Sequence, residues 1–153
     1  MYRRILVPVD GSETSLLGLA EAIRLAKGQQ TTLRLLHVVH DFLVAVGYGG
    51  ADYANQLRKD MVAQGEQVLN DAADRARQQQ VDAETRLVQT PAGSVGEAIV
   101  DEARDWPADL IVLGTHGRRG IRRLAMGSDA EQVVRSTPVP VLLVRAPETA
   151  HRR

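Results

Sequence analysis

The sequence contains no cysteine, and only two of its 153 residues are lysines, Lys27 and Lys59. The absence of cysteine excludes disulfide bonds, a catalytic thiolate and zinc sites built from cysteine. Acidic and basic residues are equal in number, 19 of each, which argues against a general surface for nucleic acids or membranes. No apolar run approaches the length of a membrane span, and the run that begins at Ile5 is too short for a signal peptide. We therefore expect a cytoplasmic protein that binds neither nucleic acid nor membrane.

Strand-like and helix-like segments alternate along the whole chain. With 44% apolar and 25% charged residues, the chain can bury a core of ordinary size. Short apolar runs at 4–9, 32–39 and 109–113 predict buried strands, and the run at 138–144 predicts a last strand. Polar–apolar alternation at 83–89 predicts a strand with one side in contact with water. Apolar residues at helical spacing predict four helices between the strands. The stripe of the first consists of Leu16, Leu19, Ala20, Ile23 and Ala26, and that of the second of Ala54, Leu57, Met61, Val68, Ala72 and Ala76.

This order of segments predicts an α/β fold with a doubly wound, five-stranded, mostly parallel sheet and helices on both faces, of the Rossmann-like type. Residues 1–146 are expected to form one domain and 147–153 a loose tail, while the glycine-containing connection at 40–52 stays unassigned. The strand at 83–89 and the last strand, which contains Pro140, are expected at the sheet edges. Ligands bind such sheets beyond the carboxyl ends of the strands, where the winding reverses. If strands one and four flank that point, Asp10 and Gly114 face each other across one crevice.

The segment from 109 to 128, DLIVLGTHGRRGIRRLAMGS, has the features expected of a ligand-binding loop. A short apolar strand ends at Gly114, and glycines beyond a strand let backbone N–H groups approach an anion. Ser128 and Glu131 match the S-x-x-E capping box and predict the start of a helix. A helix N-terminus offers N–H donors and partial positive charge to a phosphate. The pattern of strand, glycine loop and helix start therefore predicts an anion site.

The spacing of the glycines distinguishes between the known phosphate motifs. Neither lysine follows a glycine loop, which excludes the Walker A signature, and the dinucleotide fingerprint G-x-G-x-x-G is absent. The remaining pattern is G-x2-G-x9-G-S, from Gly114 through Gly117 to Gly127-Ser128. With RRILVPVDGSE, LLHVV, ADLIVLGTHGRRG and PVPVLLVR in this order, nearly the whole chain resembles the universal stress protein family, specifically its ATP-binding branch.

The resemblance implies a binding site for ATP, with Mg²⁺ accompanying the phosphates. It implies that the end of the first strand lines the adenine and ribose side, that Val38 packs near the base, and that the glycine loop holds ribose and phosphates. It also implies a homodimer formed by pairing of the last strands, along the apolar edge from Val139 to Val144. The matching site residues are Pro8, Val9, Asp10, Val38, Gly114, His116, Gly117, Arg118, Gly127 and Ser128.

Asp129, directly after the Gly-Ser pair, is the departure from the family pattern, because many nucleotide-binding relatives have a small or apolar residue there. A carboxylate in the first turn suits the helix dipole but repels a nearby triphosphate. This residue supports the alternative of a nucleotide-independent dimeric interaction module with the same fold. No residue stands out as a catalytic base, so an enzymatic role stays open and any ATP hydrolysis is expected to be slow.

Several candidate residues have simpler structural interpretations. Asp10 fits a turn before the first helix, with Ser12 as its N-cap. Ser94, in a sequence similar to a nucleophile elbow, is explained by a capping box with Glu97. His37, His40 and His116 lack the spacing of a metal site. The arginines at 118, 119, 122 and 123 fit either a phosphate site or a solvated surface.

Overall fold

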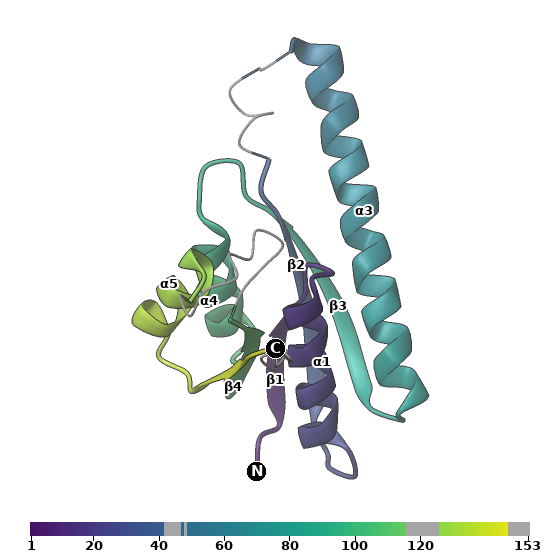
Figure 1. Cartoon of the computed structure of the whole chain (residues 1–153), viewed down its shortest axis with the longest axis vertical. Coiled ribbons are helices and arrows are strands. Elements are labelled where there is room, and N and C mark those ends of the chain that lie inside the picture. Colours follow the sequence, from purple (N-terminus) through teal and green to yellow (C-terminus); the bar gives the residue numbers. More distant parts are fainter. Residues whose placement is uncertain (42–46, 48, 116–125, 147–153) are drawn as a thin grey trace, which may run out of the picture.

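A computed structural model describes residues 1–41, 47, 49–115 and 126–146 of the chain (Figure 1). In these ranges a five-stranded sheet has the strand order β3-β2-β1-β4-β5, and every neighbouring pair is parallel. The predicted doubly wound fold is therefore confirmed, and the strands at 83–89 and 138–144 lie at the two edges as predicted. The strands are β1 (Arg4–Pro8), β2 (Thr32–Val39), β3 (Asp82–Gln89), β4 (Leu110–Gly114) and β5 (Val141–Val144).

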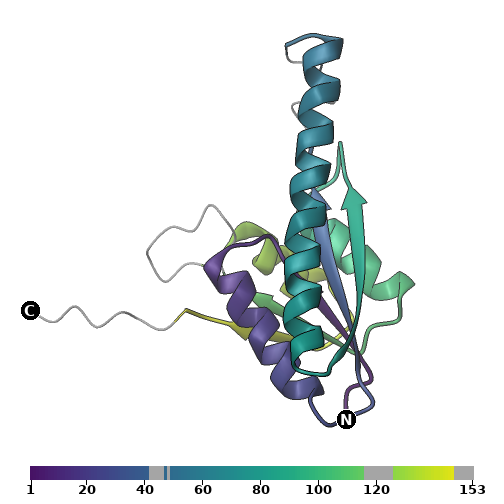
Figure 2. The same ribbon diagram turned by 90° about the vertical axis from the view of Figure 1, so that its right-hand side faces the viewer.

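Helices cover both faces of the sheet (Figures 1 and 2), and the sheet separates two apolar layers of the core. Alternate residues of each strand point to opposite faces, so Ile5 and Val7 pack under one layer and Leu6 under the other. Helices α1 (Glu13–Ala26) and α3 (Ala51–Gln78) cover the first layer, and α4 (Val95–Asp105) and α5 (Ser128–Ser136) cover the second. The central strand β1 is buried on both faces.

Local signals in the sequence set several of the helix ends. Ser12 is the N-cap of α1, and its hydroxyl accepts a hydrogen bond from the Ser15 N–H at 3.2 Å. Gly28, with φ of +73°, follows the end of this helix and is free to adopt the left-handed conformation there. Ser94 and Glu97 form the predicted capping box of α4, with reciprocal bonds of 3.0 and 3.1 Å. One predicted stripe residue, Ala20, is exposed, because the buried face of α1 runs through Gly18 and Ala22 instead.

The predicted capping box at Ser128 is wrong. The N-cap of α5 is Gly127, and Ser128 is already the first helical residue. The side chain of Glu131 accepts a hydrogen bond from the Arg135 guanidinium at 2.5 Å. Because a capping box requires the serine to stand before the first helical residue, a shift of one position removes it.

Helix α3 is far longer than the strands on which it packs. Its 28 residues correspond to about 42 Å, whereas the eight residues of β2 span about 26 Å. Both views show the first half of α3 extending beyond the carboxyl ends of the strands. Of the predicted stripe, Ala54, Ala72 and Ala76 are buried, while Leu57, Met61 and Val68 are half-buried.

Candidate functional site

The winding of the sheet reverses between β1 and β4. The chain runs outward from β1 through β2 to β3 and then returns to β4 on the other side of β1. The register between β1 and β4 contains only Ile5↔Leu110 and Leu6↔Ile111, so the recorded pairing stops before the carboxyl ends of both strands. Ligands of doubly wound sheets bind at such a reversal. The prediction that strands one and four flank this point is confirmed.

Val9, just beyond the end of β1, is held in place through both of its backbone polar groups. Its N–H donates to the Leu36 carbonyl at 2.8 Å, and its own carbonyl accepts from Nδ1 of His37, also at 2.8 Å. The Val9 side chain is 3% exposed and belongs to the apolar layer under α1 and α3. Val9 therefore fixes the backbone at this end of the sheet, while its neighbours Pro8 and Asp10 are partly exposed.

Asp10 forms the turn that leads into α1. Its Oδ1 accepts from the Ser12 N–H at 2.9 Å, and its N–H lies 3.4 Å from the Ser15 hydroxyl. This geometry is the side chain-to-backbone turn that aspartate favours before a helix. The structural interpretation of Asp10 is confirmed, and the turn holds its carboxylate at the carboxyl end of β1.

Gly114 is in close contact with the first turn of α1. A Cβ atom at Gly114 would lie 2.6 Å from the carbonyl oxygen of Thr14, and one at Gly18 would lie 3.3 Å from the Gly114 nitrogen. Only glycine at position 114 allows the helix and the strand to approach this closely. The contact brings the end of β4 to the N-terminus of α1, beside the turn of Asp10.

A backbone hydrogen bond brings the two ends of the glycine loop together. The Gly127 N–H donates to the Thr115 carbonyl at 2.8 Å, and the Thr115 N–H donates to Val144 on β5 at 3.0 Å. The N-terminus of α5 is thereby placed at the carboxyl end of β4. Of the loop residues predicted to bind a ligand, His116, Gly117 and Arg118 lie outside the described residues.

The N-terminus of α5 differs from that of α1 in its cap. Gly127 has φ of −61° and ψ of 151°, and it has no side chain that could accept from the first-turn N–H groups. Ser128 and Asp129 are exposed at this terminus. Helix α5 is anchored to α4, since the Ser94 hydroxyl donates to Oε1 of Gln132 at 2.6 Å. The first N–H groups of α5 are therefore held in a fixed position and lack a side-chain cap from their own N-cap residue.

A charged cluster that the sequence did not suggest lies between β2 and α4. The guanidinium of Arg34 contacts Glu102 at 2.7 Å and Glu84 at 2.9 Å, and it stacks 4.6 Å from the ring centre of Trp106. Arg86 adds a longer contact of 3.4 Å to Glu102, which is 6% exposed. These pairs hold α4 against the sheet and lie on β2 and β3, away from the reversal at β1 and β4.

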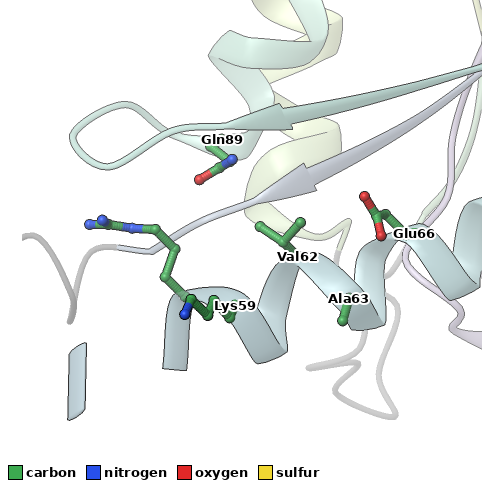
Figure 3. Close-up of a pocket in the computed structure, with 6 residues that line it drawn as sticks. Lys59, Val62, Ala63, Glu66 and Gln89 are labelled. Carbon is green, nitrogen blue, oxygen red and sulfur yellow. The ribbon is translucent and has the colours of Figure 1, made fainter. Parts of the chain in front are cut away.

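A shallow hollow of about 270 Å³ lies beside α3, next to the end of β3 (Figure 3). It has no clear chemical selectivity, because cationic and anionic side chains line it together with small apolar ones. Close by, the buried carboxylate of Asp41 accepts from Nε of Arg58 at 3.0 Å, while its Oδ1 has no hydrogen-bond partner among the residues that the structure describes. The lining residues are Arg58, Lys59, Val62, Ala63, Glu66 and Gln89.

Two further observations concern metals and membranes. Within the described ranges, no group of three or more histidine, aspartate or glutamate side chains could hold a metal ion. No helix in the same part of the chain is both long and apolar enough to cross a membrane. His37, one of the three histidines considered as ligands, instead binds the Val9 carbonyl.

The sheet is parallel, its winding reverses between β1 and β4, and the starts of α1 and α5 converge there. These features define a doubly wound α/β protein, a class whose ligands bind beyond the strand ends. The model of the universal stress protein family matches residues 1–145. The universal stress protein YxiE of Bacillus subtilis is 30% identical over 151 residues, which cover 95% of this chain and 100% of that protein. This chain belongs to the universal stress protein family.

Solved structures agree with this assignment. The structure of MJ0577, a protein of Methanocaldococcus jannaschii, superposes with a TM-score of 0.87 at 25% identity, covering 97% of this chain and 99% of that one. A universal stress protein in complex with cAMP superposes with a TM-score of 0.65 at 27% identity, covering 94% and 97%. The fold therefore extends over nearly the whole length of both proteins.

Proposed function

We propose that this protein binds an adenine nucleotide, with ATP as the physiological ligand, beyond the carboxyl ends of β1 and β4, and that it acts as a stress-response regulator. The observation that carries the proposal is the hydrogen bond from the Gly127 N–H to the Thr115 carbonyl, because it fixes the uncapped N-terminus of α5 at the end of β4. Such a terminus provides N–H donors and partial positive charge for phosphate oxygens. The related protein that was solved with cAMP supports an adenine nucleotide in particular.

The two helix N-termini at this site take different roles in the proposal. The first turn of α1 is already capped by the Ser12 hydroxyl, so its donors are less available to a ligand. The glycine cap of α5 leaves that turn as the phosphate-binding end, with Ser128 adding a hydroxyl. The carboxylate of Asp10, at the end of β1, is suited to a ribose hydroxyl. Mg²⁺ would arrive with the phosphates.

Calorimetric titration with Mg-ATP, and with AMP and GTP for comparison, tests the proposal. The wild-type protein should bind ATP, and Gly127→Val should abolish this binding. The φ and ψ of Gly127 are open to any residue, so valine can block the phosphate position without straining the backbone. Gly28→Asn, at an open turn that an asparagine tolerates, is the control and should bind like the wild type. Absence of heat from the wild type at millimolar nucleotide would refute the proposal.

We also propose that two copies pair through β5. Pro140 and Val144 direct their carbonyls toward β4, so the alternation of a strand directs the peptide groups of Val141 and Leu143 outward. The proline thus lacks its N–H on the side of β4, and the outer edge keeps its donors. An edge of half-buried apolar residues with available donors favours pairing with a second copy.

Sedimentation velocity tests the dimer. A dimer is expected at micromolar concentration, and Val141→Pro should yield a monomer, because it removes an outward donor without removing a bond to β4. A wild-type monomer would contradict the pairing. A dimer that forms while no nucleotide binds would instead favour the nucleotide-independent interaction module. Release of inorganic phosphate from ATP at catalytic rates would favour an enzyme.

A further inference from the structure

His37 lies at the junction of three elements of the fold. Its ring extends from β2, is 8% exposed, and places Nδ1 at 2.8 Å from the carbonyl oxygen of Val9 beyond the end of β1. Because a carbonyl only accepts hydrogen bonds, Nδ1 carries the proton and donates it. The opposite edge of the ring faces α3 at Gly65, where a Cβ atom would lie 2.6 Å from Cδ2 and 3.0 Å from Nε2.

The Val9 peptide needs this contact because the regular strand has ended there. Pro8 is the last residue of β1, and Gly11, with φ of +79°, already turns the chain toward α1. The hydrogen bond from Val9 to Leu36 fixes the N–H side of the residue, and the bond from His37 fixes its carbonyl side. That carbonyl belongs to the peptide plane that leads into Asp10. The His37 imidazole thus determines the direction in which the backbone at Asp10 leaves the sheet.

We propose that His37 is a positioning residue of the nucleotide site, which orients the Val9–Asp10 peptide and is itself held in place by the glycine at position 65. The inference rests on the proposed nucleotide binding and extends it to a residue that does not touch the ligand. Helix α3 contributes to this positioning, because a side chain at position 65 would push the His37 ring away from Val9. The base and ribose side of the site is therefore preorganised from the α3 side of the sheet.

Nucleotide titrations of four variants test the role of His37. His37→Leu removes the donor and should weaken Mg-ATP binding about tenfold, the effect of 1.4 kcal/mol. His37→Asn can place an amide donor near the position of Nδ1 and should restore affinity to within about threefold of wild type. Gly65→Ala should weaken binding in the wild-type background, and it should have little effect beside the shorter asparagine.

Leu87→Ala is the matched control. Leu87 lies on the neighbouring strand, and its Cδ1 is 3.0 Å from the same Cβ position on Gly65, yet its side chain has no donor for the Val9 carbonyl. This variant loosens the packing under α3 and leaves the hydrogen bond intact, so its affinity should stay within about twofold of wild type. Equal losses in His37→Leu and Leu87→Ala would reduce His37 to a packing residue and overturn the proposal. Wild-type affinity in His37→Leu would also overturn it.

A measurement without nucleotide tests the geometry by itself. The amide resonance of Asp10 should shift in His37→Leu, because the preceding carbonyl loses its donor, and should keep its position in Leu87→Ala. If His37→Leu does not fold, the Asp10 amide resonances of His37→Asn and Gly65→Ala are compared instead. A wild-type protein that binds no nucleotide would refute the proposed function, whereas binding that is indifferent to His37 would refute only the positioning role.

Discussion

Gly114 on β4 and Thr14 on α1 are in such close contact that a Cβ atom at 114 would lie 2.6 Å from the Thr14 carbonyl oxygen. The two nearest obstructing atoms belong to the backbone of the helix, which cannot move aside as a flexible side chain could. This contact explains why a glycine ends β4, independently of any ligand. It also fixes the distance between the starts of α1 and α5, on which the proposed site depends.

Gly114→Ala is expected to lower the free energy of unfolding by about 1–3 kcal/mol, the usual cost of overpacking. Chemical denaturation followed by circular dichroism measures the change. Ala20→Gln, at an exposed position of α1, serves as the control and should change the stability by less than about 0.5 kcal/mol. An alanine variant as stable as the wild type would show that α1 and β4 separate easily.

Two serines that look alike in the sequence should respond differently to alanine. Ser94→Ala removes the N-cap bond to Glu97 and the bond to Gln132, so a loss of about 1–2 kcal/mol in unfolding free energy is expected. Ser128→Ala should cost less than about 0.5 kcal/mol, because Ser128 is exposed and is not the cap. Thermal and urea unfolding of both variants measure the difference. Equal losses would restore the rejected capping box at Ser128.

Glu102 is expected to be the most sensitive member of the charged cluster. Glu102→Ala leaves the half-buried Arg34 without its closest partner, and a loss of about 2–3 kcal/mol is expected in urea unfolding. The loss stays below that of an isolated buried pair because Glu84 still contacts Arg34. Asp101→Ala, at the exposed neighbouring position, should cost less than about 0.5 kcal/mol. Similar values for both would mean that the cluster contributes no more than surface pairs.

Asp129→Asn is expected to strengthen ATP binding by about three- to fivefold, since a carboxylate near the phosphates costs about 1 kcal/mol at surface distances. The gain should be smaller for AMP, which carries less charge, and should shrink at high salt. Calorimetry with both nucleotides at two ionic strengths measures these effects, with Asp101→Asn as a distant control. An unchanged ATP affinity would place the Asp129 side chain away from the phosphates.

The exposed pair of Glu21 and Arg24 gives a small pH dependence. The hydrogen bond from Arg24 lowers the pKa of Glu21 below the ordinary value of 4.5, more than desolvation raises it. A lowered pKa means stability that is present above the unfolded-state value and lost as the pH falls through the folded-state value. Glu21→Gln should therefore reduce the unfolding free energy slightly at pH 7, and this reduction should shrink as the pH falls and Glu21 becomes protonated. A loss that persists at pH 2 would have a cause other than charge.

The elements of the fold were predictable because each depends on a local pattern. Apolar runs predicted the strands, and the alternation at 83–89 and the proline at 140 predicted the edges. The last strand is shorter than predicted, beginning at Val141, because proline cannot donate to β4 and Pro140 contributes only a carbonyl. Ser94 was assigned correctly because its capping box is contained within four consecutive residues.

The features that the sequence did not predict, or predicted wrongly, depend on the three-dimensional arrangement of the chain. The cap of α5 depends on the direction from which the chain enters the helix, and neighbouring Gly127 and Ser128 both match a cap in the sequence. The contact of Gly114 with Thr14 spans 100 positions, and the bond from His37 to Val9 spans 28, so no spacing rule reveals them. The sequence indicated which glycines matter, whereas the tertiary contacts gave the reason.

The two halves of α3 are packed unequally, so their backbone hydrogen bonds are expected to open at different rates. From Gly65 to its end, buried residues attach it to the sheet, whereas Ala54 is the single buried residue recorded before that point. Amide protons in the second half should therefore exchange with solvent only through global unfolding, and those of the first half through local fraying. The first half of α3 can thus gain or lose stability without a change in the sheet.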